Sequence, residues 1–276
     1  MSETITVGVI QFAPALDKAA NLERIDVLVR DAVGQGATVV CLPEYSVQYG
    51  TLIDERSVAE IYAPGAEAID GASGQFFSEL ARELGITLHA GSFIERHESG
   101  LSNTTRVYGP VGELRATYRK THLFRAFAPE LTNDEAAYLE AGTDVVTLLA
   151  GAPGSEVRLG LTICFDVRFP ELYLELMRAG AEVVISPAAF PAKTGRAHWE
   201  VLQRARAIEN QCYVIAPAQC GVLADGTEMF GNSMIVDPWG KVIECLPEGE
   251  GVIVAEIDPG QARRLRVEFP NLSARL

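Results

Sequence analysis

Short runs of apolar and β-branched residues recur along the chain and predict a protein rich in strands. Runs of four to eight such residues, bounded by Gly, Pro, Asn or Asp, are typical of β-strands. We expect about eleven strands, at 5–12, 38–42, 86–94, 106–108, 114–118, 157–163, 183–186, 212–216, 233–236, 242–245 and 252–257.

Helical periodicity separates several of these runs. Apolar residues recur every three to four positions over four segments, and each segment ends near Gly or Asn, which favour helix ends. We expect helices at 19–33, 74–84, 171–178 and 198–210. The apolar stripe of the last helix is expected to pack in the core; it consists of Val201, Leu202, Ala205 and Ile208.

Other strands follow one another directly across turns. The segments 107–118 and 235–245 each hold two strand-like runs around a turn with Gly and Pro, which is typical of a β-hairpin. Crossover units and hairpins together predict an α/β protein with a mixed sheet, or sheets, covered by helices. Because no linker-like stretch divides the chain, we expect one domain over residues 1–276.

Charge and hydropathy narrow the range of partners. The formal net charge is −14, which opposes binding to phosphates, so nucleic acid is not an expected partner. The apolar runs at 145–150 and 212–218 are far shorter than the roughly 18 residues of a membrane span, so no membrane partner is expected. The first residues lack the basic and apolar segments of a signal peptide, and we expect a cytoplasmic protein.

The cysteines and histidines show no disulfide or metal-binding pattern. Five cysteines, at 41, 164, 212, 220 and 245, are odd in number and contain no Cys-x-x-Cys pair, which favours reduced thiols. None of the four histidines, at 89, 97, 122 and 198, lies four residues from another. We therefore expect no metal and no cofactor.

Cys164 lies where the apolar run 157–163 gives way to polar and aromatic residues. A thiol fixed at a strand end, whose next backbone N–H groups can face a substrate, suits a nucleophile. Judged alone, one cysteine among five is more often a small buried hydrophobic residue. A thiol with a pKa of about 8.5 is only a few per cent thiolate at neutral pH, so a nucleophilic Cys164 needs a base or a cation nearby.

Glu44 and Lys120 are candidates for the base and the cation. Glu44 ends the run 38–42 and Pro43, at the end of the strand where α/β proteins gather functional groups; alternatively, it stabilises a helix N-terminus. Lys120 follows a hairpin strand and, if buried, could hold an oxyanion. The alternative for Lys120 is a solvated basic cluster with Arg115, Arg119, His122 and Arg125.

Three segments in the same order resemble the catalytic segments of the carbon-nitrogen hydrolase (nitrilase) superfamily. They are Leu-Pro-Glu at 42–44, Tyr-Arg-Lys-Thr-His-Leu-Phe at 118–124 and Gly-Leu-Thr-Ile-Cys-Phe-Asp-Val-Arg-Phe-Pro-Glu at 160–171. The similarity covers nearly the whole chain, including the segments 195–200 and 232–240.

The resemblance implies a four-layer α-β-β-α sandwich and a role for each candidate residue. Glu44 would be the general base, Lys120 the oxyanion-stabilising lysine and Cys164 the nucleophile. The family usually carries a second glutamate that orients the lysine and the substrate. Glu135 is the candidate, because Glu135, Leu139 and Gly142 match the corresponding pattern; Glu130 is the alternative.

The implied reaction is hydrolysis of an amide through a thioester. Cys164 would attack the amide carbonyl while Glu44 accepts the thiol proton, and Lys120 and the backbone N–H of Phe165 would hold the negative charge on oxygen. Ammonia then leaves, and Glu44 activates water against the thioester.

The sequence after Cys164 and the segment 197–209 resemble the Nit amidase branch, which includes deaminated glutathione amidase and ω-amidase. Both substrates carry carboxylates, so the pocket needs a cation; Arg168 is the nearest in sequence, with a salt bridge to Glu171 or Asp166 as the alternative. Phe165 and the loop 190–195, beginning with Phe190, are expected to line the pocket.

The segment 125–129, aromatic and basic, departs from the acidic segment of many Nit members and favours a larger acidic substrate such as deaminated glutathione. The alternatives are an ω-amidase acting on α-ketoglutaramate, an N-carbamoyl amino acid hydrolase, and a catalytically silent protein of the same fold. Family members usually form homodimers or larger assemblies, and the segment 269–272 resembles tails that pack against a partner subunit.

Overall fold

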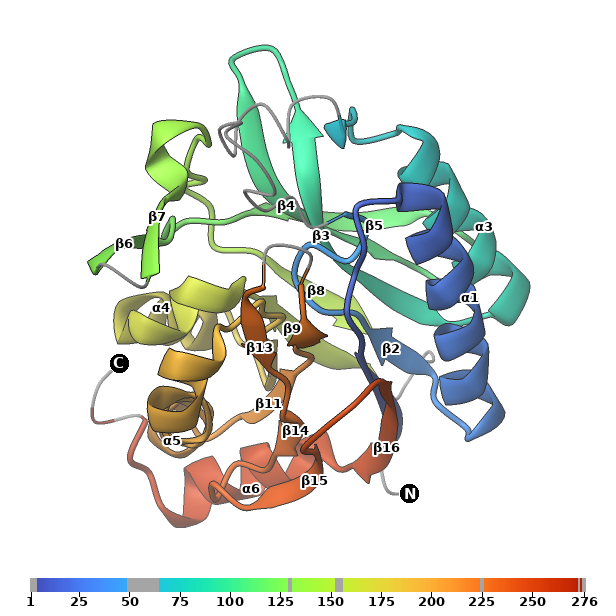
Figure 1. Cartoon of the computed structure of the whole chain (residues 1–276). Helices are drawn as coiled ribbons and strands as arrows, with labels where there is room; N and C mark the ends of the chain where they lie inside the picture. Colours follow the sequence, from blue (N-terminus) through green and yellow to red (C-terminus); the bar gives the residue numbers. More distant parts are fainter. Residues whose placement is uncertain are drawn as a thin grey trace.

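The structure is a computed structural model, described for residues 4–48, 65–128, 131–151, 156–223, 226–272 and 274. Two six-stranded sheets lie between two layers of helices (Figure 1). In Figure 1, α1 (Lys18–Gly34) and α3 (Ala72–Leu84) cover one outer side, and α4 (Pro170–Arg178) and α5 (Ala192–Asn210) cover the other. The protein is therefore the expected α-β-β-α sandwich.

The first sheet combines parallel and antiparallel strands, as the mixture of crossovers and hairpins predicts. Its order is β16 (Gly251–Ile257), β1 (Ile5–Gln11), β2 (Val39–Cys41), β3 (Thr87–Arg96), β4 (Leu101–Tyr108) and β5 (Leu114–Arg119). The strands β1, β2 and β3 are parallel, and the other neighbours pair antiparallel.

The second sheet repeats this plan. Its order is β15 (Val242–Leu246), β14 (Ser233–Val236), β11 (Tyr213–Ala216), β10 (Val183–Ile185), β9 (Val157–Leu161) and β8 (Thr147–Ala150). The strands β9, β10 and β11 are parallel, and the others pair antiparallel. Because functional groups gather beyond the carboxyl ends of parallel strands, Glu44 after β2 and Cys164 after β9 lie in favourable positions.

The main apolar core lies between the two sheets and continues under α4 and α5. Val39 of the first sheet and Leu159 and Val184 of the second belong to the same buried cluster. A second cluster, with Ile25 and Phe77, fills the space between the first sheet and the helices α1 and α3. Since burying one such side chain contributes about 1.5–3 kcal/mol, the two cores fix both sheets as rigid supports for their end loops.

Several elements differ from the sequence prediction. The strand expected at 106–108 begins at Leu101, because the polar residues 102–105 are all buried and hydrogen-bonded inside the protein. The strand β8 and two small hairpins were not expected. The hairpins are β6 (Arg125–Ala128) with β7 (Leu131–Asp134), and β12 (Cys220–Val222) with β13 (Glu228–Phe230).

Helix α5 corrects two further predictions. It begins at Ala192, so most of the expected loop 190–195 is helical; Gly195 leaves room for the Phe230 ring, which lies where a Cβ would be. The expected apolar stripe is confirmed only in part: Leu202 packs against the core, but Val201 is 67% exposed and Ile208 is also exposed. The buried face of the helix carries Trp199 and Ala207 instead.

Helix α6 (Pro259–Glu268) has only two buried residues and lacks the apolar period that would predict it. Among the described helices, none combines the length and the apolar character needed to cross a membrane.

Candidate active site

Lys120 is held between two carboxylates and is 1% exposed. Its Nζ lies 2.8 Å from Oε1 of Glu44 and 2.9 Å from Oε2 of Glu135. Its backbone is fixed as well, since its N–H donates to the Asn103 carbonyl and its own carbonyl accepts from the Gly142 N–H. The alternative of a solvated basic cluster is therefore wrong for Lys120.

Glu44 lies in a turn after β2, and no helix begins there, so the helix-capping alternative is wrong. Its Oε1 also accepts from Asn103 Nδ2 at 2.9 Å, and its Oε2 accepts from the Ala189 N–H at 2.8 Å. Gly91 permits this turn to lie against β3, because a Cβ at Gly91 would be 2.0 Å from the Pro43 carbonyl oxygen.

Cys164 opens the 3₁₀ turn η2 (Cys164–Arg168) with a backbone φ of 47°. A side chain rarely adopts this left-handed conformation, and such strain recurs at active sites. The Cys164 N–H donates to the Pro187 carbonyl at 2.7 Å. The thiol lies close enough to the Glu44 carboxylate for its charge to raise the thiol pKa. The N–H of Phe165 has no hydrogen-bond partner among the described residues, which leaves it available to a substrate oxygen.

Glu135 begins the 3₁₀ turn η1 (Glu135–Ala137) and is fully occupied by hydrogen bonds. Its Oε1 accepts from the Tyr45 hydroxyl at 2.6 Å, and its Oε2 accepts from the Phe124 N–H at 2.7 Å. With both oxygens engaged, Glu135 is suited to hold Lys120 and not to move protons. The alternative residue, Glu130, lies outside the described residues.

The shared burial shifts the pKa values of the group. Burial raises the pKa of Glu44, and the Glu135 charge adds to this while Lys120 opposes it. Burial and the Glu44 charge raise the pKa of the Cys164 thiol well above its usual range. For Lys120, burial lowers the pKa, but the carboxylates of Glu135 and Glu44 outweigh it and raise the pKa well above normal. Lys120 is therefore a permanent cation, and Cys164 is a neutral thiol that needs a base.

Arg168 ends the turn η2 that Cys164 opens, and its side chain lies among aromatic rings. Its guanidinium carbon is 5.1 Å from the ring centre of Phe190 and 5.7 Å from that of Phe165. It donates to Nδ1 of His198 at 3.3 Å, and no ion pair joins it to another described residue. The expected alternative, a salt bridge to Glu171 or Asp166, is therefore absent from the described structure.

Sequence reasoning missed several residues that complete the site. Asn103 and Tyr45 each bond a carboxylate next to Lys120, and the Ala189 N–H bonds Glu44. The one available signal was the polar run 102–106, unusual in a strand of a sandwich core. The other contacts join residues far apart in the chain, so no local pattern indicates them.

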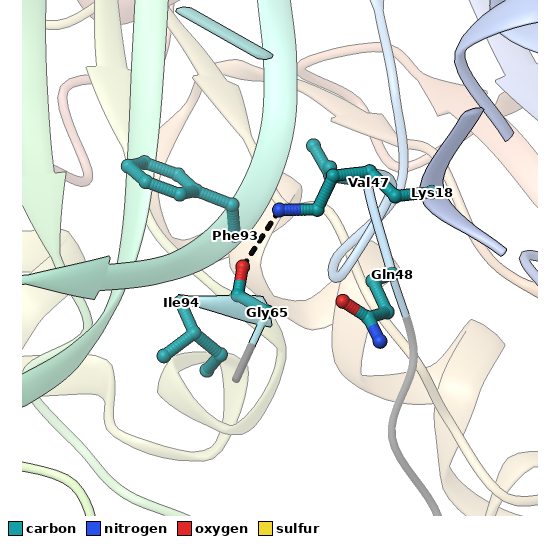
Figure 2. Close-up of a pocket in the computed structure, with 6 residues that line it drawn as sticks. All are labelled: Lys18, Val47, Gln48, Gly65, Phe93 and Ile94. Atoms are coloured by element: carbon teal, nitrogen blue, oxygen red, sulfur yellow. Dashed lines mark hydrogen bonds between the residues drawn. The ribbon is translucent and has the colours of Figure 1, made fainter. Parts of the chain in front are cut away.

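A small surface pocket lies apart from these residues (Figure 2). Figure 2 shows its six lining residues, Lys18, Val47, Gln48, Gly65, Phe93 and Ile94, with the Lys18 ammonium donating to the Gly65 carbonyl oxygen at 2.7 Å. None of the four candidate catalytic residues lines it. The described residues contain no cluster of three or more His, Cys, Asp or Glu side chains arranged for a metal ion.

Comparisons with known proteins assign the chain to a family. The carbon-nitrogen hydrolase family matches residues 6–267. The chain belongs to this family. It is thus a hydrolase that acts on carbon-nitrogen bonds of amides.

Three relatives illustrate the match. The chain is 39% identical to a deaminated glutathione amidase of Synechocystis over 93% of this chain and 92% of that protein. It is 36% identical to the zebrafish (Danio rerio) omega-amidase NIT2 over 96% and 92% of the two chains. The crystal structure of the C. elegans NitFhit protein superposes with a TM-score of 0.86 at 34% identity; it matches 98% of this chain, which spans 64% of the NitFhit chain.

The raised pKa of Glu44 predicts where activity is lost in acid. If Glu44 is the general base that the family resemblance implies, it must be ionised to act, and kcat/KM should fall as the pH drops through its pKa. Since that pKa lies above the ordinary 4.5, the acid limb of the profile should also lie above pH 4.5. Rates of amide hydrolysis between about pH 4 and about pH 9 measure this limb.

Circular dichroism at each pH and recovery of activity at neutral pH separate titration from unfolding. Glu44→Gln should lower kcat by about 100- to 10,000-fold at neutral pH, the usual effect of losing a general base. Full wild-type activity at pH 4.5, or an active Glu44→Gln, would contradict the assignment.

Proposed function

We propose that the protein hydrolyses the amide of a small carboxylate-bearing substrate and releases ammonia, as a deaminated glutathione amidase. The observation that carries this proposal is the meeting of Glu44, Lys120 and Cys164 in one buried group, with the Arg168 guanidinium beside it. The likeness to the Synechocystis protein over nearly its full length supports the substrate.

In the first half-reaction, Sγ of Cys164 bonds to the amide carbon while Glu44 accepts the thiol proton. The raised pKa of the thiol keeps it protonated until the bond to carbon forms, and the raised pKa of Glu44 allows that carboxylate to hold the proton. The two events are therefore coupled. An ammonium has three protons; Glu44 and Glu135 take two of those on Lys120, and the third faces the new oxyanion, together with the Phe165 N–H. The C–N bond breaks, and Glu44 returns its proton to the leaving ammonia.

In the second half-reaction, Glu44 removes a proton from water, and the resulting hydroxide attacks the thioester carbon. The C–S bond then breaks, the carboxylic acid product leaves, and the proton on Glu44 returns to the sulfur. Glu44 can serve both steps because Asn103 Nδ2 and the Ala189 N–H hold its two oxygens in place throughout.

Arg168 is the cation that we assign to the substrate carboxylate. It is half-buried, and burial lowers its pKa because the guanidinium charge is partly removed from water. A substrate carboxylate beside it would restore a charged hydrogen bond and would therefore be bound strongly. The aromatic and basic residues after Phe124 contribute less to the pocket than their sequence suggests. Residues 125–128 form the strand β6 of a hairpin, and Arg125 already pairs with Asp134 at 3.0 Å. Phe165 and Phe190 provide the apolar walls beside Arg168.

We also propose that residues 1–276 form one domain that works in the cytoplasm as a homodimer or larger assembly. All five cysteines are free, which suits a reducing compartment. Trp239 and Phe269 are exposed, their rings are 6.4 Å apart, and exposed Ile208 lies beside Gly240. Such an apolar cluster favours contact with a second copy. Leu272, expected to be part of the docking tail, is instead buried in its own chain.

An amide panel tests the function. Deaminated glutathione should release ammonia with a higher kcat/KM than α-ketoglutaramate, and N-carbamoyl amino acids should release no carbon dioxide. Faster turnover of α-ketoglutaramate would assign an ω-amidase, and carbon dioxide would assign an N-carbamoyl amino acid hydrolase. Cys164→Ala should release no ammonia. A wild-type protein that releases none from the whole panel would contradict the amidase assignment.

The same panel tests Arg168. Arg168→Met should lower kcat/KM for carboxylate-bearing amides by about 10- to 100-fold, the effect of losing a charged hydrogen bond. A neutral amide such as propionamide is the control and should be hydrolysed by the variant as well as by the wild type. An equal loss on both kinds of substrate would give Arg168 a structural role.

Sedimentation velocity tests the assembly. The wild type should sediment as a dimer or larger species, and Trp239→Ser with Phe269→Ser should shift it toward the monomer. Val222→Ser is the matched control, because Val222 is as exposed as Trp239 but lies on β12. A monomeric wild type would refute the proposal.

A further inference from the structure

Asp166 is fully buried and its carboxylate accepts four hydrogen bonds. Oδ1 accepts from the backbone N–H of His122 at 3.0 Å and faces Nδ1 of the same residue at 2.8 Å. Oδ2 accepts from the Tyr118 hydroxyl at 2.7 Å and from the Ile163 N–H at 2.8 Å. Because an ionised carboxylate only accepts, Nδ1 of His122 carries the proton.

The four donors occupy special places in the chain. Tyr118 and His122 lie two residues before and two residues after Lys120, and Ile163 directly precedes Cys164. Tyr118 belongs to β5 in the first sheet, whereas Ile163 follows β9 in the second. One carboxylate therefore joins the segment that carries the catalytic lysine to the segment that carries the nucleophile.

Neighbouring contacts make this junction rigid. The His122 ring stacks on Phe169 with ring centres 3.7 Å apart and an interplanar angle of 6°. The Phe169 N–H donates to the backbone carbonyl of Asp166 at 3.0 Å, which closes the 3₁₀ turn. The lysine segment thus rests on both ends of the turn that Cys164 opens.

We propose that Asp166 is a positioning residue that sets the distance between the Lys120 ammonium and the Cys164 sulfur. Asp166 touches no reacting atom. It acts on Lys120 through Tyr118 and His122, and on Cys164 through the preceding residue, Ile163. This inference rests on the proposed function for its effect on kcat. A residue that served packing alone would not require an acceptor for four donors at the junction of the two catalytic segments.

Asp166→Asn is the sharpest variant, because it keeps the size of the side chain but turns an NH₂ group toward donors. We expect kcat to fall by about 100-fold with little change in KM, since a displacement near 1 Å has such an effect. Alkylation of Cys164 by iodoacetamide, followed on the Cys164 peptide by mass spectrometry, should become slower and shift to higher pH, because the thiolate loses the nearby ammonium.

Two other variants make the test complete. Tyr118→Phe removes one of the four hydrogen bonds to Asp166, together with the two contacts of the same hydroxyl with Thr121. It should give smaller changes in the same direction, and it carries the test if Asp166→Asn does not fold. Asp237→Asn is the matched control: Asp237 is also buried and accepts two backbone N–H bonds, but in the turn between β14 and β15. It should leave kcat and the alkylation profile unchanged.

A folded Asp166→Asn and a folded Tyr118→Phe with wild-type kcat and wild-type alkylation would overturn the proposal, even if both melt at lower temperature. Alkylation requires no amide substrate. A wild-type protein that releases no ammonia would therefore refute the proposed function, while the alkylation profiles of the variants would still decide the role of Asp166.

Discussion

The structure depends above all on one buried ammonium between two carboxylates. Removing an ion from water costs several kcal/mol, and attraction to a partner offsets this only when the geometry is well held. Lys120 meets that condition through ion pairs with Glu44 and Glu135 and through backbone hydrogen bonds to Asn103 and Gly142. Burial raises the pKa of Glu44, and the nearby charge of Glu135 raises it further, while Lys120 opposes both.

This constraint explains the use of two sheets. Glu44 and Lys120 follow strands of the first sheet, and Cys164 follows a strand of the second. The apolar core between the sheets therefore sets the distance of Cys164 from Glu44 and Lys120. The strained backbone of Cys164 aims the thiol back toward Glu44 and leaves the Phe165 N–H free for substrate. A single helix or hairpin could not hold these groups at the required spacing.

Much of the fold could be predicted from periodicity, because both sheets are built from short apolar strands between helices. The start of β4 could not be predicted in this way, because its residues are polar although they are buried. They are hydrogen-bonded inside the protein, as Asn103 is to Glu44. Glu44, Lys120 and Cys164 could be found by resemblance to a family, whereas their burial and mutual distances required the structure. The contacts of Asp166 with Tyr118 and His122 connect residues more than forty positions apart, and no local pattern predicts them.

The most direct test of this account is to trap the acyl group on the enzyme. The protein would be mixed briefly with deaminated glutathione, quenched in acid and mapped by peptide mass spectrometry, with hydroxylamine added in parallel to capture a thioester as the hydroxamate. We predict a mass increase equal to the substrate minus ammonia on the Cys164 peptide alone, and hydroxamate in the parallel sample. Acylation of a different cysteine, or continued ammonia release with no adduct and no hydroxamate, would contradict the account.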